Sequence, residues 1–195
     1  MKLKLVFIAL SIMGLSSCNS SPAQAGNQGG MTGNPPEKAL VVYFSWGGNT
    51  RTVAKNMGEI TNAEVFELLP AIPYTRDRDE IEEVAKREVR EGYQPPLKEM
   101  PQNLAQYDVI YVGSPCWFTT IAPPVATFMA KAELSGKTVV PFMTHGGNRM
   151  GRSVEDMKRL APKANVTEGL PISESRVAQS KEEITTWLRK NNLIK

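Results

Sequence analysis

The sequence is poor in the side chains that form disulfides and bind transition metals. Its 195 residues include two cysteines, Cys18 and Cys116, and one histidine, His145. Two thiols form at most one disulfide, so a small disulfide-stapled fold is excluded. One free thiol and one imidazole are also too few ligands for a zinc site. The sequence therefore predicts a chain that is held together by an apolar core and binds no metal.

The chain also lacks a strong excess of charge of either sign. It has 23 basic and 20 acidic side chains, and the counts are 21 and 20 when Lys2 and Lys4 are set aside. Such a balance produces no long-range field that would attract nucleic acid or an acidic substrate. Hydrophobic residues make up 41% of the chain and charged residues 22%, an ordinary globular mixture that excludes disorder of the whole chain. A nucleic-acid partner is therefore not expected.

The N-terminal apolar run is too short to cross a membrane. It extends from Leu5 to Leu15, whereas a membrane-spanning helix needs roughly 20 residues. Two lysines precede the run and Leu-Ser-Ser-Cys ends it, which is the order of basic, apolar and small residues in a secretory signal. The sequence therefore predicts a signal peptide over residues 1–17.

The residues around Cys18 resemble a bacterial lipobox, in which the cysteine is lipidated and becomes the new N-terminus. The resemblance implies a lipid anchor at the inner or outer membrane of a bacterial cell envelope, with the domain outside the cytoplasm. An ordinary secretory signal with an incidental cysteine is the alternative. Gly, Asn, Ser and Pro dominate residues 19–37 without a hydrophobic period, so we expect residues 18–37 to form a flexible tether spanning about 25 Å r.m.s..

From Lys38 onward, strand patterns alternate with helix patterns. Apolar runs predict strands at residues 39–44, 64–68, 109–112, 138–143 and 166–172. Apolar residues at helical spacing predict helices over residues 53–60, 79–91, 123–129, 154–160 and 181–193. Pro141 is the weak point of the fourth strand, because proline has no N–H for the sheet. The alternation is typical of a parallel sheet covered on both faces, and it predicts one three-layer α/β domain over residues 38–195.

The turn between the first strand and the first helix has the composition of a phosphate-binding loop. It reads Ser45-Trp46-Gly47-Gly48-Asn49-Thr50; the glycines let backbone amides approach a ligand, and the helix N-terminus supplies unpaired N–H groups. No lysine follows as in a Walker motif, and no GxGxxG is present, so the loop suits a monophosphate better than ATP or a dinucleotide. A plain helix cap with Thr50 as the N-cap residue is the alternative.

Two other strand ends carry unusual segments. Gly113-Ser114-Pro115-Cys116-Trp117-Phe118 follows the third strand, and Thr144-His145-Gly146-Gly147-Asn148-Arg149-Met150-Gly151 follows the fourth. Ligands of open α/β sheets bind beyond the carboxyl ends of the strands. We therefore expect both segments to lie near the phosphate-binding loop.

These three segments together resemble the flavodoxin family. The first is similar to the family's phosphate loop, Thr/Ser-x-Thr-Gly-x-Thr, with Gly47 as a departure, and the second is similar to its Gly-x-Pro-x-Trp loop. The resemblance covers residues 38–195. It implies FMN as the cofactor and a three-layer sandwich around a five-stranded parallel sheet in the order 2-1-3-4-5.

The resemblance also implies which residues bind FMN. Trp117 would stack on the flavin ring, and the glycine-rich backbone after the fourth strand would donate hydrogen bonds to the ring's pyrimidine oxygens. The expected cofactor-binding residues are Ser45, Trp46, Gly47, Gly48, Asn49, Thr50, Ser114, Pro115, Cys116, Trp117, Phe118, Thr144, His145, Gly146, Gly147 and Gly151. No catalytic residue is expected. Many flavodoxins have a stacking tyrosine in the third segment, and this chain has none, so Met150 or Trp46 covers the second ring face or it is left open.

A few residues have two interpretations. His145 is a structural hydrogen-bond partner, or else it lies near the reduced ring and makes the flavin potential pH-dependent. Arg51 either reaches the phosphate or faces solvent. Residues 70–78, with Tyr74, Arg76 and Arg78, are either a further contact surface on the ligand side or an ordinary exposed loop.

Three functions are compatible with the sequence. The leading one is a membrane-tethered FMN protein that shuttles electrons, in which the Ser114 region or the Gly146-Gly147 backbone hydrogen-bonds the flavin. The alternative is an NAD(P)H-dependent FMN or quinone reductase, which the near-neutral charge favours because soluble flavodoxins are typically acidic. The third is a non-redox scaffold that has lost FMN. The sequence does not identify the redox partner, whether a protein, a small quinone or NAD(P)H.

Overall fold

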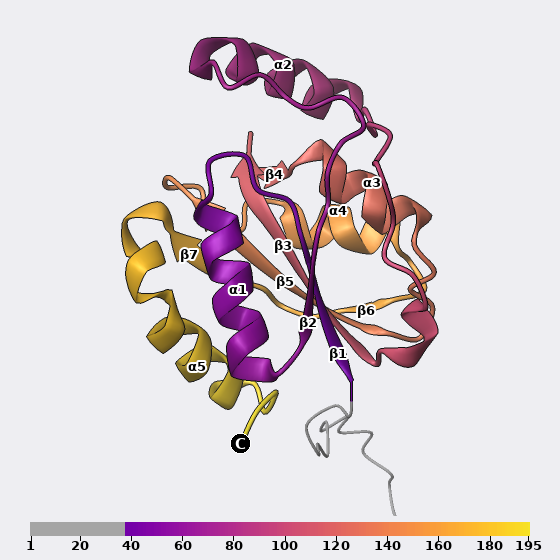
Figure 1. The fold of residues 1–195 in the computed structure, drawn as a ribbon, viewed down its shortest axis with the longest axis vertical. Coiled ribbons are helices and arrows are strands. Elements are labelled where there is room, and N and C mark those ends of the chain that lie inside the picture. The colour runs from indigo at the N-terminus through magenta and orange to yellow at the C-terminus, as the bar shows by residue number, and fades with distance from the viewer. Residues whose placement is uncertain (1–37) are drawn as a thin grey trace, which may run out of the picture. The chain divides into compact units, whose positions relative to one another are not determined.

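A parallel sheet with helices on both faces makes up residues 38–195, the part of the chain that the computed structural model describes (Figure 1). Its main strands are β1 (Ala39–Tyr43), β2 (Glu64–Glu67), β3 (Val109–Trp117), β5 (Thr138–His145) and β6 (Asn165–Val166), in the order β2-β1-β3-β5-β6. This is the order 2-1-3-4-5 once the short β4 (Thr120–Ile121) is left out of the numbering. The predicted α/β fold class is therefore confirmed. The predicted signal peptide, the tether and Cys18 lie outside the described residues.

The prediction of one fifth strand over residues 166–172 is wrong, because two short strands pair with β5. β6 pairs with the start of β5, and β7 (Leu170–Ser173) pairs with its end. Val139 of β5 pairs with Val166 and Phe142 pairs with Leu170, so the segment that joins β6 to β7 has one residue more than the stretch of β5 beside it. The break lies beside Pro141, which has no N–H to donate to a neighbouring strand. Pro141 leaves β5 itself continuous, and the neighbouring strand is divided into β6 and β7 beside it.

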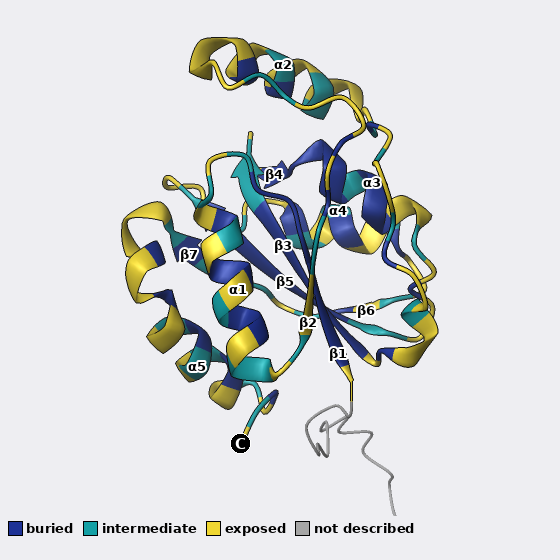
Figure 2. Ribbon diagram, viewed as in Figure 1, coloured by how far each residue is buried: buried dark blue, intermediate teal, exposed yellow. Residues whose placement is uncertain are grey.

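Four helices cover the two faces of the sheet. α1 (Asn49–Thr61) and α5 (Ser180–Lys190) lie on one face, and α3 (Pro123–Lys131) and α4 (Ser153–Leu160) lie on the other (Figure 1). Successive residues of the central strands enter opposite cores, and Figure 2 shows these strands buried along most of their length. Two 3-10 helices, η1 (Leu104–Gln106) and η2 (Glu174–Gln179), complete the set. None of the helices in residues 38–195 is long and apolar enough to span a membrane.

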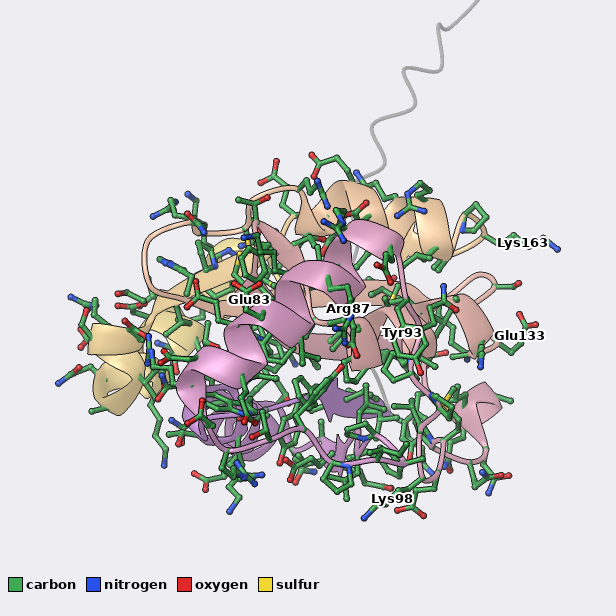
Figure 3. All side chains as sticks on the ribbon, turned by 90° about the horizontal axis from the view of Figure 1, so that it is seen from above. Glu83, Arg87, Tyr93, Lys98, Glu133 and Lys163 are labelled. Carbon is green, nitrogen blue, oxygen red and sulfur yellow. The ribbon has the colours of Figure 1, made fainter. Side chains whose placement is uncertain are left out.

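The remaining helix, α2 (Arg78–Glu91), covers neither face of the sheet. Its start is fixed by Asp77, whose side chain accepts two backbone N–H groups of the first turn, and its end by Gly92 at φ 64°. The helix predicted over residues 79–91 is confirmed, but Figures 1 and 3 show it above the sheet, at the edge where the central strands end. Only Ile81 and Ala85 of this helix are buried.

The second segment predicted as a loop is mostly strand. Gly113 to Trp117 are the last five residues of β3, and Thr144 and His145 are the last two of β5. β3 continues because Gly113, Ser114 and Pro115 pair with consecutive residues of β5. The two strand ends are therefore held in register by the sheet itself.

Gly113 leaves the space that the ring of Phe142 occupies. The two residues are paired across β3 and β5, and a Cβ at Gly113 would lie 2.2 Å from the fully buried ring. We expect Gly113→Ala to lower the free energy of unfolding by about 1–3 kcal/mol, as overpacking of a core does. Denaturant unfolding followed by circular dichroism measures the change.

Gly47→Ala is the matched control for this prediction. A Cβ at Gly47 meets nothing within 4 Å, so its stability should stay within about 0.5 kcal/mol of the parent chain. Equal stabilities of the two variants would contradict the packing described for Gly113 and Phe142.

Candidate functional site

One cavity of about 770 Å³ opens at the carboxyl ends of β1, β3 and β5, a volume that is typical of small-molecule sites. All three predicted segments contribute to it. The predicted residues that line it are Ser45, Trp46, Gly47, Asn49, Thr50, Pro115, Cys116, Trp117, Phe118, Thr144, His145 and Gly146. The structure thus brings these residues together, and their role in binding FMN stays a prediction.

Four other predicted site residues, Gly48, Ser114, Gly147 and Gly151, are not among those that line the cavity. The hydroxyl of Ser114 is buried; it donates to the carbonyl of Pro115 (2.9 Å) and accepts from the backbone N–H of Ala122 (2.8 Å). The Ser114 hydroxyl is thus engaged within the protein, and a flavin hydrogen bond from the Ser114 region stays a prediction. Ser114 fastens the connection between β3 and α3.

The start of α1 offers backbone N–H groups to the cavity. Gly48 is the N-cap residue at φ 97°, and no side chain caps the first turn, so the alternative with Thr50 as N-cap is wrong. The Ser45 Oγ accepts from the Gly48 N–H at 3.1 Å, which closes the turn before the helix. The buried Thr50 hydroxyl lies 2.7 Å from that of Thr144 at the end of β5. An uncapped helix start surrounded by hydroxyls is a donor set that fits a phosphate.

Arg51 is not among the residues that line this cavity. Its guanidinium binds both carboxylate oxygens of Glu67 in β2, and the hydroxyl of Tyr43 also donates to Glu67 at 3.0 Å. Burial, and secondly the hydrogen bond to Glu67, raises the pKa of Tyr43 to about 12. The Arg51 side chain makes an ion pair at the edge of the sheet and is still 39% exposed, so the solvent-facing interpretation is the nearer of the two.

Two aromatic rings fix the orientation of Trp117. Its ring packs edge-to-face against Phe44 (centroids 5.6 Å apart, 83° between planes) and against Tyr74 (5.5 Å, 72°). The Tyr74 hydroxyl donates to Glu88 of α2 at 2.6 Å. Tyr74, predicted as part of a contact surface or an exposed loop, is therefore part of this support. Trp117 itself is only partly buried and lines the cavity, so a planar ligand could contact the indole.

The turn after Trp117 is held in an unfavourable backbone conformation. Phe118 and Thr119 connect β3 to β4, and both have positive φ, 45° and 67°. This type of turn normally uses Asn and Gly, because bulky and β-branched residues are strained there. The Thr119 carbonyl accepts from the Arg152 N–H at 2.8 Å, and a Cβ at Gly151 would lie 2.1 Å from that carbonyl oxygen. Gly151 thus supports the turn that presents Trp117 and Phe118, instead of lining the cavity.

His145 is the last residue of β5, the strand next to β3, and it also lines the cavity. Its Nδ1 accepts from the Gly147 N–H at 3.1 Å, which fixes the first turn of the glycine-rich segment. Burial, and secondly the positive charge of Arg149, lowers the pKa of His145, so the imidazole is neutral at neutral pH. His145 is therefore a structural hydrogen-bond partner of the Gly147 N–H, as one of the two interpretations predicted.

Several lining residues were not predicted as site residues. Glu174 of η2 lies beside Gly146, Asn148 also lines the cavity, and α2 contributes Ile81, Glu82 and Ala85. Arg78, which was predicted as part of either a contact surface on the ligand side or an exposed loop, is the first residue of α2 and lines the cavity. The sequence predicted the apolar stripe of α2, but it did not predict that this stripe lines the cavity. Of the two residues considered for the second ring face, Trp46 lines the cavity, whereas Met150 packs against Gly169 and the core.

Cys116 is a partly buried thiol in the wall of this cavity. Burial raises the pKa of the Cys116 thiol, and a backbone hydrogen bond from Thr119 opposes the shift. Since the thiolate is the reactive form, we expect slow alkylation at pH 7 that accelerates with rising pH. The pH at which the alkylation rate reaches half of its maximum should be higher for Cys116 than for a cysteine in an unstructured peptide. Mass spectrometry of a Cys18→Ser chain treated with iodoacetamide between pH 7 and 10 measures it, and a midpoint at or below the peptide value would contradict the burial.

Comparison with known proteins identifies the family. A flavodoxin family model matches residues 38–191. A Bacteroides eggerthii flavoprotein structure is 30% identical with a TM-score of 0.66, and the match covers 81% of this chain and 99% of that one. A Bacteroides uniformis flavoprotein is 28% identical (TM-score 0.68; 78% and 97% covered), and a Lactobacillus acidophilus flavoprotein in complex with FMN is 25% identical (0.62; 73% and 97%). No curated protein sequence matches the chain. The chain belongs to the flavodoxin family.

Proposed function

We propose that this chain binds FMN and works as a flavodoxin-like electron-transfer protein. The observation that carries the proposal is the joint presence, in one cavity, of an uncapped helix start and a partly exposed tryptophan. The first suits a phosphate dianion and the second an aromatic ring system, which are the two ends of FMN. The FMN complex of the Lactobacillus acidophilus flavoprotein supports the same assignment.

The chain's own residues would bind and orient the cofactor. FMN supplies the redox chemistry when bound. The α1 start and the hydroxyls of Ser45 and Thr50 hold the phosphate end, and Trp117 contacts the ring. The backbone around Gly146 approaches the ring edge. Because His145 is neutral, it adds no positive charge beside the ring at neutral pH.

A flavin titration tests the proposal on a fragment that starts near Gly26. This fragment contains both cores, and the solved relatives consist almost entirely of the matching domain. We expect FMN fluorescence to be quenched on binding. Riboflavin should bind at least about tenfold more weakly, because each hydrogen bond to a charged group contributes about 1.5–3 kcal/mol. Trp117→Ala should weaken both ligands by a similar factor.

The same titration can overturn the proposal. No binding of FMN up to about 100 μM, a free energy of roughly −5.5 kcal/mol, would contradict it. The non-redox scaffold would then be the better explanation. Equal affinity for FMN and riboflavin would show that the α1 start does not recognise a phosphate.

The second candidate is an NAD(P)H-dependent flavin or quinone reductase. The observation in its favour is the balance of 21 basic and 20 acidic side chains beyond the two lysines of the predicted signal, since a strongly acidic surface would favour docking to basic partner proteins. The discriminating measurement is the absorbance of the FMN-loaded fragment after anaerobic addition of NADPH or NADH. Rapid bleaching identifies a reductase, and a stable spectrum favours the carrier.

We also propose that lipidation of Cys18 tethers the domain to a bacterial membrane. The support is the order of lysines, apolar run and small residues before Cys18. In a bacterial host supplied with a clickable fatty acid, we expect the parent chain to be labelled and recovered with membranes. Cys18→Ser should abolish both, whereas Cys116→Ser should change neither. Labelling of the Cys18→Ser chain would contradict the proposal.

A further inference from the structure

The position of α2 points to a role in the cofactor site. A helix that connects two parallel strands usually packs on a face of the sheet, whereas α2 lies across the edge where the strands end (Figure 1). Arg78, Ile81, Glu82 and Ala85 line the cavity, and their spacing of three and four residues places them on one side of the helix. Ile81 and Ala85 are its only buried residues. The buried side of α2 thus faces the cavity.

The segment before α2 ties its start to the loop that begins α1. The Arg76 guanidinium donates to the carbonyl of Trp46 at 2.7 Å, and the Trp46 indole N–H donates to the carbonyl of Thr75 at 2.8 Å. These reciprocal bonds hold the residues just before Arg78 beside Trp46. The first turn of α2 therefore lies next to the end of the cavity where the uncapped α1 start is found.

Arg78 is the only lysine or arginine among the residues that line the cavity. Within residues 38–195 it forms no ion pair, unlike Arg51 and Arg176, which bind carboxylates. Its guanidinium is exposed and free to bind an anion that enters beside Trp46. Glu82, one turn further along the same side of α2, would repel an anion and so favours the Arg78 end.

We propose that α2 is a roof over the cofactor, in which Arg78 binds the phosphate of FMN and Ile81 and Ala85 cover its ring. The proposal rests on the FMN binding proposed above. It gives an apolar cover for the ring in a chain whose glycine-rich segment has no aromatic residue. The distance along α2 from Arg78 to Ala85 is about 10 Å at 1.5 Å per residue, so one helix side can serve both ends of an extended ligand.

The cation is tested with Arg78→Gln in the fragment from Gly26. We expect its Kd for FMN to rise about tenfold, because a charge-assisted hydrogen bond to the phosphate is lost, while its Kd for riboflavin stays unchanged. The FMN affinity of the variant should also depend less on salt concentration. Arg87→Gln is the matched control; Arg87 is an exposed arginine of the same helix outside the cavity, labelled in Figure 3.

The apolar cover is tested with Ile81→Ala. This change should weaken FMN and riboflavin by the same factor, about fivefold, because it removes contact area with the ring that both ligands share. Val84→Ala removes a similar side chain that does not line the cavity, and it should leave both affinities unchanged. Hydrogen exchange of α2 amides gives an independent readout: FMN should slow exchange in the parent chain and slow it less in Arg78→Gln.

The outcomes separate this proposal from the proposed function. If the parent fragment does not bind FMN, both fall. If the parent binds FMN and Arg78→Gln binds it as tightly as Arg87→Gln, the role of Arg78 is refuted and FMN binding stands. If Arg78→Gln weakens riboflavin as much as FMN, Arg78 does not act on the phosphate. Unchanged α2 exchange on addition of FMN would refute the roof.

Discussion

The buried hydrogen bond between the hydroxyls of Thr50 and Thr144 joins the parts of this site. Thr50 lies in the first turn of α1 and Thr144 near the end of β5; the two oxygens are 2.7 Å apart, and both residues are buried. Thr144 is also paired with Pro115 of β3. One bond thus links the helix start to two strand ends. A shift of one residue between β3 and β5 would turn their side chains to the opposite face and separate the walls of the cavity.

Several residues near the cavity act by holding others in place. Ser114 fastens β3 to the start of α3, and Gly151 makes room for the Thr119 carbonyl. The Phe118–Thr119 turn is strained in the left-handed region, and strain of this kind persists where the surrounding structure enforces it. Since the turn directly follows Trp117, the strain lies next to an aromatic residue that lines the cavity.

The path of the chain between β2 and β3 distinguishes this protein's site from a cavity built of strand-end loops alone. Residues between these strands pass Trp46 and Trp117 and continue into α2, which faces the cavity with one cation, one carboxylate and two apolar side chains. Tyr74 connects this segment to β3 and to α2, because its ring packs on Trp117 and its hydroxyl donates a hydrogen bond to Glu88. The aromatic support and the helix above the cavity are therefore one connected structure.

The sequence by itself determined the fold class and the three segments that surround the cavity. Continuous apolar runs and helical spacing are local patterns, and parallel strands necessarily end at one edge, so residues such as Ser45, Trp117 and His145 could be grouped without coordinates. Only the tertiary structure decided which of these residues face inward. The Ser114 hydroxyl accepts a hydrogen bond from the N–H of Ala122, and Arg51 forms an ion pair with Glu67. These partners lie 8 and 16 residues away in the chain. The place of α2 was also beyond the sequence, because an apolar stripe is the same whether it covers a sheet face or a cavity.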